Sequence, residues 1–344
     1  MLISDVQARR GFTLVELAVA MGITVIVTGL TLQAFMAAQQ TNQIGSNILE
    51  TNQNVRAGMS YMTRDLIQTG NGIPTGGVPV PSGTGSRPIN RPGPVAMTFP
   101  AGQVLQAVTT GRDLGPRVDG QATDLITVLF ADRSLAIDDF PLAAITNGGT
   151  RARVDARTPI TGGPAAIRTG DVILFTNARG NALQTVTGTD GGQTMFFDAG
   201  DAFAFNQVNT QFGGISSLDD QNGVFPPTTA TRVTMVTYYI DAVTNPQVPR
   251  LVRRRNFEPA IAVALVIDNV QITYDLIDGS NAINPALVNV PEPVAPNTAA
   301  QIRKINLFLS GRSESIDTRS RQTFRTNLAT QLSLRGLAYV DRYQ

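Results

Sequence analysis

A long, uncharged and mostly apolar run near the N-terminus dominates the polarity pattern of the chain. No charged side chain occurs between Glu16 and Glu50, and residues 17–38 are largely apolar. At about 1.5 Å per helical residue this stretch would extend about 33 Å, which matches the hydrocarbon core of a bilayer. The pattern therefore predicts a single transmembrane helix, which we place at residues 12–38.

Apolar side chains then recur every three or four positions through residues 39–69. This spacing is typical of one face of an α-helix, so we expect the helix to continue as an amphipathic segment that covers a sheet. Gly45 and Gly58 each weaken it by about 1 kcal/mol, and Gly70 predicts its end near Thr69. The recurring positions are Ile44, Ile48, Thr51, Val55, Met59, Met62 and Leu66.

The remainder of the chain lacks a long helical period. Residues 70–94 are rich in Gly, Pro, Ser and Thr, and predict an irregular surface connector. Residues 95–344 contain short β-rich runs separated by Gly and Pro turns, which predicts a β-rich globular head. The fold class is therefore α+β, with one long N-terminal helix packed on a large antiparallel sheet. The clearest strand-like runs are residues 124–130, 171–175, 232–240, 270–276, 305–309 and 324–334.

Composition excludes several kinds of chemistry. The chain has 344 residues with no His, no Cys and no Trp. It therefore has no disulfide, no thiolate or imidazole metal ligand, and no cysteine or histidine for catalysis. The sequence gives no pair of carboxylates at a defined separation, so we expect no enzymatic activity. No nucleotide-binding glycine motif follows a strand, so we also expect no nucleotide use. The formal net charge of +1 argues against general nucleic-acid binding, which needs a basic surface.

The residues at the start of the apolar run form a specific pattern, Arg-Arg-Gly-Phe-Thr-Leu-Val-Glu-Leu at positions 9–17. The two arginines place the preceding end in the cytoplasm by the positive-inside rule. A secretory signal peptide fits poorly, because its apolar region is shorter and its small residues follow that region. A plain membrane anchor leaves Glu16 unexplained, because a carboxylate inside an apolar segment is costly without a partner.

This pattern resembles the N-terminal signal of type IV prepilins, with Gly11, Phe12 and Glu16 at the three anchor positions. The resemblance implies a leader of residues 1–11, cleavage between Gly11 and Phe12 by a prepilin peptidase, and N-methylation of Phe12. It also implies that Glu16 pairs with the N-terminal amine of a neighbouring subunit, so that the partners are other pilin subunits. The leader contains two arginines and one aspartate, so its removal leaves a neutral mature chain.

The helix end at residues 61–70, Tyr-Met-Thr-Arg-Asp-Leu-Ile-Gln-Thr-Gly, is similar to that of PilW-type minor pilins and of J-type minor pseudopilins. This resemblance implies a structural subunit that joins a type IV pilus or primes its assembly. The subunit would first lie in the bacterial inner membrane with its head in the periplasm, and then at the cell surface. A pseudopilin of type II secretion, and an adhesin or DNA-binding module displayed on a pilus, remain as alternatives.

Two groups in the head are candidate binding residues. Arg250, Arg253, Arg254 and Arg255 could contact phosphates, and the alternative is that they pair with nearby aspartates or contact another subunit. Asp219 and Asp220 lie in an acidic turn. Such oxygen-rich loops can hold Ca²⁺, although the spacing is not that of an EF-hand and an ordinary turn explains it as well. We expect no other cofactor or metal.

Overall fold

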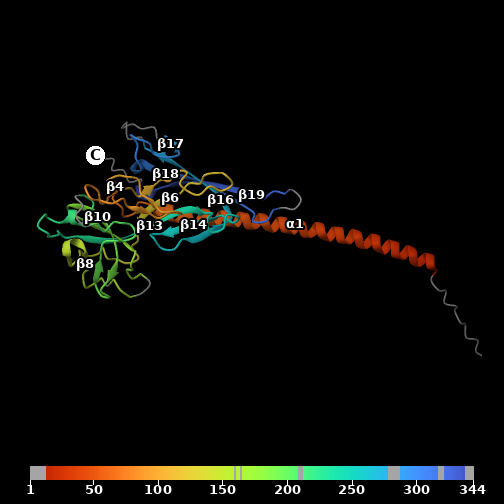
Figure 1. Ribbon diagram of the computed structural model, residues 1–344, viewed down its shortest axis with the longest axis horizontal. Coiled ribbons are helices and arrows are strands. Elements are labelled where there is room, and N and C mark those ends of the chain that lie inside the picture. The colour runs from red at the N-terminus through yellow and green to blue at the C-terminus, as the bar shows by residue number, and fades with distance from the viewer. Residues whose placement is uncertain are drawn as a thin grey trace, which may run out of the picture.

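A computed structural model shows one long helix that enters a β-rich head (Figure 1). The helix α1 spans Leu14–Gln68, and its N-terminal half projects away from the head. This architecture confirms the predicted α+β class. The structure describes residues 13–158, 160–162, 165–207, 212–277, 287–316 and 321–337.

The largest sheet is a seven-stranded antiparallel sheet built around β13 (Thr229–Asp241). β13 pairs with three strands, because its 13 residues are long enough to serve different partners along its length. Its partners β6 (Ile126–Ala131) and β9 (Val172–Asn177) are almost entirely buried. The other members are β5 (Val108–Thr109), β10 (Gly180–Thr185), β14 (Arg250–Arg255) and β15 (Ile261–Leu265).

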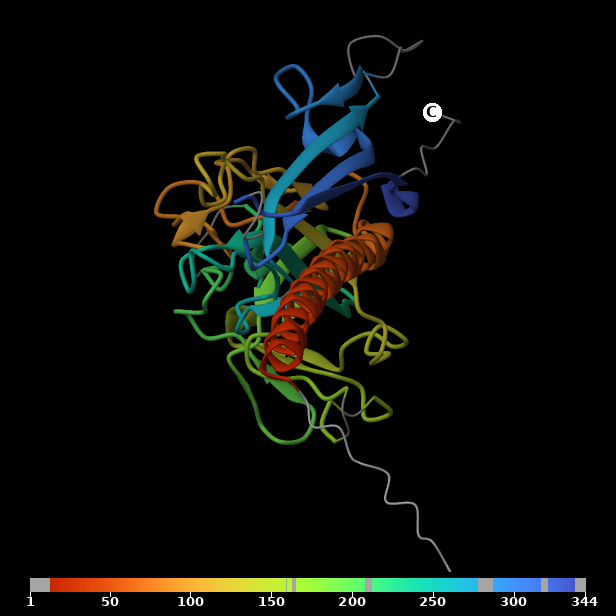
Figure 2. The ribbon, with the colours of Figure 1, turned by 90° about the vertical axis from the view of Figure 1, so that its right-hand side faces the viewer.

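A second antiparallel sheet has four strands in the order β17-β16-β18-β19. The C-terminal half of α1 packs on β18 and β19 of this sheet and on β15 of the large sheet, and Figure 2 shows the helix beside these strands. Val55, Met62 and Leu66 of α1 enter the main core there. The strands are β16 (Ile267–Leu276), β17 (Leu287–Val290), β18 (Ile302–Arg312) and β19 (Arg325–Ser333).

The helix and the large sheet approach each other closely at Gly58. A Cβ atom added there would lie 3.0 Å from Leu251 Cδ2 and 3.1 Å from Ala264 Cβ. The glycine therefore lowers intrinsic helix stability but allows α1 to rest directly on the large sheet. Farther toward the N-terminus, Ile44 is already exposed, because the helix has left the head by that point.

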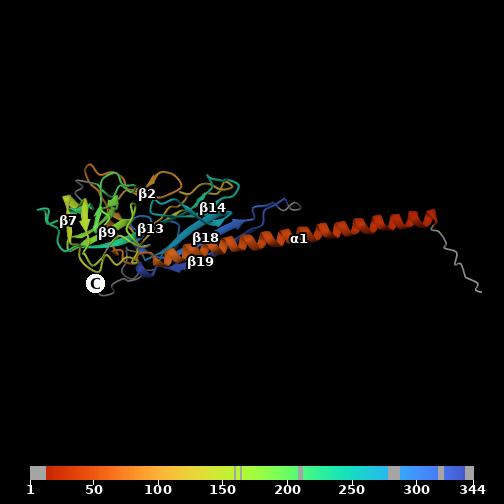
Figure 3. The ribbon, with the colours of Figure 1, turned by 90° about the horizontal axis from the view of Figure 1, so that it is seen from below.

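A third sheet forms a separate layer at the end of the head that lies farthest from the N-terminus of α1 (Figures 1 and 3). We call this layer the distal lobe. A second apolar core lies between this layer and the large sheet, and in it the rings of Phe175 of β9 and Phe197 meet edge to face at 5.3 Å. Its strand order is β11-β12-β8-β7, and the strands are β7 (Ala144–Thr146), β8 (Arg151–Arg153), β11 (Gly188–Thr189) and β12 (Thr194–Phe196).

Residues 70–94 are more than a surface connector, because Ile73, Val78, Val80 and Ile89 are buried in the main core. Two short pairs anchor this region to the loop that follows it. They are β1 (Val78–Pro79) with β4 (Val104–Leu105), and β2 (Asn90–Arg91) with β3 (Met97–Thr98). After α1, the helical segments among the described residues are all short 3₁₀ turns. They lie at Asn147–Gly149, Ile215–Leu218, Ala299–Gln301 and Arg335–Leu337.

Candidate functional site

The projecting half of α1 exposes apolar side chains on all sides. Leu14 is 84% exposed and Met36 is 64% exposed, with similar values between them. The most apolar window of the helix has a mean hydropathy of 2.0, and none of it is buried in the head. Exposed apolar surface costs about 25 cal/mol per Å² in water, so this surface needs lipid or other helices to cover it.

Three threonines within this half-helix bond to the helix itself. The hydroxyls of Thr24, Thr31 and Thr41 donate to carbonyls one turn earlier, at 2.7, 2.8 and 2.9 Å. Such bonds let threonine lie in an apolar environment without an unpaired donor. The half-helix is therefore suited both to a bilayer and to the interior of a helical filament.

A capping box formed by Thr13 and Glu16 begins the helix. The backbone N–H and the hydroxyl of Thr13 donate to Glu16 Oε2 at 3.0 and 2.9 Å, and Glu16 N–H donates to Thr13 Oγ1 at 3.2 Å. The sequence interpretation identified Glu16 but missed Thr13. The signal was present, because Thr-x-x-Glu before an apolar run is a recognised helix start. Gly11 and Phe12 lie outside the described residues, so their cleavage and methylation stay predictions.

This geometry leaves Glu16 available to a neighbour. The side chain is exposed at the N-terminal end of the helix, where the helix dipole favours a negative charge. Both donors from Thr13 reach the same oxygen, Oε2. The capping box thus fixes the direction of the carboxylate while its other oxygen can accept a donor from a second molecule.

A buried cluster of three side chains joins the other end of α1 to the head. Asp65 Oδ2 accepts hydrogen bonds from Arg253 Nε at 2.5 Å and from the Tyr238 hydroxyl at 2.6 Å. Burial, followed by the charge of Asp65, raises the pKa of Tyr238 above its usual value, so the phenol stays protonated. Burial would lower the pKa of Arg253, but the hydrogen bond to Asp65, the charge of Asp65 and the neighbouring Tyr238 together outweigh it and raise that pKa. The sequence interpretation missed Asp65, because its charge set it apart from the apolar stripe.

The other arginines of the predicted basic group also have partners within the chain. Arg250 forms an ion pair with Asp241 at 2.8 Å, directly across the β13–β14 ladder. Arg254 donates to the carbonyls of Glu258 and Gly93, and it forms no ion pair with a carboxylate in the described part of the chain. The group therefore does not form one continuous basic surface, because its members point to separate partners on different parts of the head.

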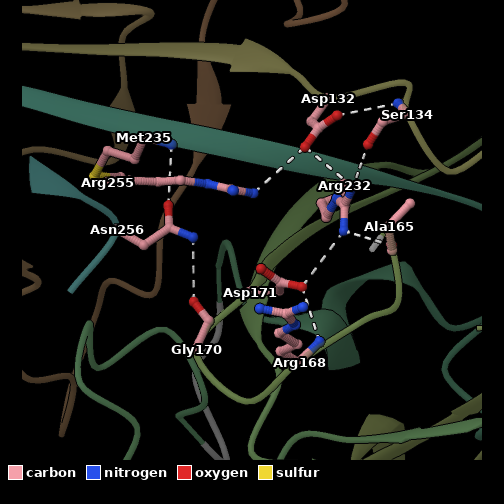
Figure 4. Close-up of polar contacts among 10 residues, drawn as sticks. All are labelled: Asp132, Ser134, Ala165, Arg168, Gly170, Asp171, Arg232, Met235, Arg255 and Asn256. Carbon is pink, nitrogen blue, oxygen red and sulfur yellow. Dashed lines mark hydrogen bonds and ion pairs between the residues drawn. The ribbon is translucent and has the colours of Figure 1, made fainter. Parts of the chain in front are cut away.

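Arg255 belongs to a polar network between the large sheet and the distal lobe. Figure 4 shows Arg232 between Asp132 and Asp171, with Arg255 reaching Asp132 from the neighbouring strand. The contacts to Asp132 Oδ2 are 3.1 Å from Arg232 and 3.4 Å from Arg255, and Arg232 lies 3.7 Å from Asp171. Beside this network, Asn256 N–H donates to the Met235 carbonyl, and Met235 N–H donates to Asn256 Oδ1.

The calcium candidates lie in an ordinary turn. Asp219 Oδ1 accepts the N–H of Gln221, and Asp220 Oδ1 accepts the N–H groups of Asn222 and Val224. These are Asx-type bonds, which use the carboxylates to hold the backbone. Across the described parts of the chain, no group of three acidic side chains is placed to hold a metal ion.

Comparison with known proteins finds one match, which lies at the N-terminus. Residues 7–32 match the prokaryotic N-terminal methylation motif, and this segment contains Gly11, Phe12, Glu16 and most of the exposed half-helix. Neither the curated proteins nor the solved structures contain a match to the chain. The methylation motif and the exposed apolar helix together support a type IV pilin-like family, whose members are processed by prepilin peptidase, anchored in the membrane and assembled with other pilins.

Proposed function

We propose that this chain is a minor type IV pilin of the PilW type, which joins a pilus or primes its assembly. The observation that supports this most directly is the division of α1 into two halves. One continuous helix of 55 residues has an exposed apolar half that carries the methylation motif and a half that is packed in the head. A subunit that enters a filament by its exposed half-helix must therefore carry its head to the filament surface.

The size and shape of the head favour a position at the filament tip. The distal lobe extends the head at the end opposite to the exposed half-helix (Figure 3). A bulky head is difficult to repeat along a thin fibre, because neighbouring subunits in the shaft are spaced closely along the axis. At the tip, or in an initiation complex, the distal lobe has no subunit above it.

Before assembly, the chain would span the inner membrane once, with its head in the periplasm. The arginines at positions 9 and 10 precede the apolar half-helix and favour this orientation. Its role would be structural and not catalytic, with the carboxylate of Glu16 guiding registration against the N-terminal amine of an adjacent subunit. The two groups neutralise each other in an apolar environment only when the subunits are in register.

The proposed function is tested by deleting the gene for this chain and complementing the deletion with the full chain carrying a C-terminal epitope. We expect the deletion to reduce surface filaments, and the tagged chain to be recovered with sheared filaments or with other pilin-like proteins extracted from the membrane. Normal filaments with a loss of secreted enzymes would instead indicate the pseudopilin of type II secretion. Normal filaments and normal secretion, with lost adhesion or DNA binding, would indicate a displayed binding module.

A further inference from the structure

A polar groove of about 340 Å³ lies beside the last turns of α1, where β6, β13 and β14 meet the helix. We call it the arginine groove. Arg64 comes from α1, Arg133 follows β6, and two more arginines come from β14. Because these side chains belong to three separate elements, their convergence is produced by the tertiary fold. The charged residues that line the groove are Arg64, Arg133, Arg253, Arg255, Asp65 and Asp132.

Asp65 is already shared among several donors. It receives Arg253 and Tyr238 as hydrogen-bond donors, and Arg64 lies 3.7 Å away. Its side chain is only 3% exposed. One carboxylate therefore neutralises at most one of the two arginines beside it.

Asp132 is shared in the same way. Its Oδ2 atom contacts Arg255 and also Arg232, which lies behind the groove and has Asp171 as a second partner (Figure 4). The four lining arginines therefore exceed the two lining aspartates by two positive charges, one of which faces the Asp138 carboxylate 4.0 Å from Arg133. The C-terminal end of α1 contributes about half a negative charge, so the groove keeps a positive balance when both are counted.

The arginines also retain unused hydrogen-bond donors. Arg255 Nε is buried and has no hydrogen-bond partner among the described residues. Arg64 and Arg133 are 62% and 69% exposed, and their nearest carboxylates lie at 3.7 and 4.0 Å, beyond hydrogen-bond distance. The groove thus combines excess positive charge with N–H groups of Arg64 and Arg133 that do not donate to a carboxylate among the described residues.

We propose that the arginine groove binds a phosphate-type dianion. Phosphate and phosphate monoesters carry about −1.5 to −2 charges at neutral pH and can accept hydrogen bonds from several arginines at once, whereas a single carboxylate carries one charge on two oxygens. The forked guanidinium group is suited to two parallel hydrogen bonds with phosphate oxygens. The ligand is either free phosphate or the phosphate monoester of a larger molecule, and both present the same oxygens to the groove.

The test uses the full chain in a non-ionic maltoside detergent. Its unfolding temperature is measured with increasing inorganic phosphate, and separately with glycerol 3-phosphate, with chloride adjusted to keep the ionic strength constant. A ligand that binds only the folded state raises the unfolding temperature by mass action. We expect a saturable rise with at least one of the two probes. Tighter binding of glycerol 3-phosphate would identify a monoester, and equal or tighter binding of inorganic phosphate would identify the free ion.

Two variants locate the site. Arg64→Gln and Arg133→Gln change exposed side chains, so their unfolding temperatures without ligand should remain close to wild type. Each should weaken binding by about ten- to one-hundred-fold, the usual effect of losing a hydrogen bond between charged groups. The matched control is Arg179→Gln, in the exposed β9–β10 turn, whose guanidinium has no ion pair among the described residues. No shift with either probe, or equal affinity in all three variants, would overturn the proposal.

Discussion

Arg253 Nε donates a hydrogen bond to Asp65 Oδ2 at 2.5 Å, and this contact joins the last turn of the long helix to β14 of the head. The two side chains are 19% and 3% exposed, so water competes weakly with the contact. Tyr238 of β13 donates to the same oxygen. The head and the half-helix that carries the methylation motif are thereby coupled through one carboxylate.

Removing that carboxylate charge should destabilise the head. Asp65→Asn leaves Arg253 without a charged partner in a mostly buried site, and we expect a loss of about 3 kcal/mol in the free energy of unfolding. Tyr238→Phe removes the hydroxyl that donates to Asp65 and to the Tyr61 carbonyl and should cost about 1.5 kcal/mol. Urea unfolding of the full chain in detergent measures both. Arg56→Gln, which changes an exposed residue on the same helix, is the control and should stay within about 0.5 kcal/mol of wild type. Equal stability of Asp65→Asn and this control would contradict the coupling.

Gly58 and Gly45 should respond to substitution in opposite ways. A side chain at Gly58 meets Leu251 and Ala264 of the large sheet, so Gly58→Leu should cost about 1–3 kcal/mol. A Cβ atom at Gly45 meets nothing within 4 Å, so Gly45→Ala should gain up to about 1 kcal/mol in helix stability. Far-ultraviolet circular dichroism during thermal unfolding reports both effects. A harmless Gly58→Leu would mean that the helix does not lie as close to the sheet as described.

Glu16 has two separable roles, as the acceptor of the capping box and as a charge for assembly. Glu16→Gln keeps a side-chain oxygen for Thr13 but removes the charge, and Thr13→Ala removes the cap but keeps the charge. Losing the cap should cost about 1 kcal/mol of helix stability. We expect Glu16→Gln to insert in the membrane but fail to enter filaments, whereas Thr13→Ala should enter them at a reduced level.

The measurement is the amount of each variant in membranes and in sheared filaments, determined by immunoblotting. Glu16→Ala removes both the cap and the charge, so it sets the lower limit of incorporation into filaments. Wild-type incorporation of Glu16→Gln would show that the carboxylate charge is not needed for registration between subunits.

Substitution of Gly11 should block processing. Gly11→Val places a β-branched side chain at the predicted cleavage site, and the chain should then retain residues 1–11. Intact-mass measurement of the membrane-extracted protein distinguishes the two forms, and wild type should show the mass of a chain that begins with methylated Phe12. Identical masses for the variant and wild type would place cleavage elsewhere.

The Asp241–Arg250 pair should stabilise the fold only at pH values where the Asp241 carboxylate is charged. Burial tends to raise the pKa of Asp241, but hydrogen bonds from Thr244 and Arg250 outweigh it and lower that pKa to about 2. An unfolded aspartate has a pKa of about 3.9, so the stabilisation is complete above that value and is lost as the pH falls toward 2. We expect wild type to have a higher unfolding temperature than Asp241→Asn at about pH 5, with the difference shrinking toward about pH 2. If the difference in unfolding temperature between wild type and Asp241→Asn does not change with pH, the charge of the carboxylate is not the source of the stabilisation.

Periodicity alone predicted the helix and most of its buried face. Thr51, Val55, Met59, Met62 and Leu66 are all buried, as the three- and four-residue spacing indicates. The strand-like runs in the head likewise correspond to strands, because long alternating or apolar segments favour one secondary structure. The distal lobe was not predicted, because its strands of two or three residues are too short to show a period.

What the sequence by itself determined is local. The methylation motif, the apolar half-helix and the capping box each depend on residues a few positions apart, whose interactions are set by the backbone geometry of one helix. The tertiary structure determined which charged side chains lie in contact. Asp65 and Arg253 are 188 positions apart, and Arg255 and Asp132 are 123 apart, so no spacing rule along the chain connects them. The packing of α1 on the head and the pairing of β6, β13 and β14 within the large sheet bring these groups together, and the same arrangement creates the arginine groove.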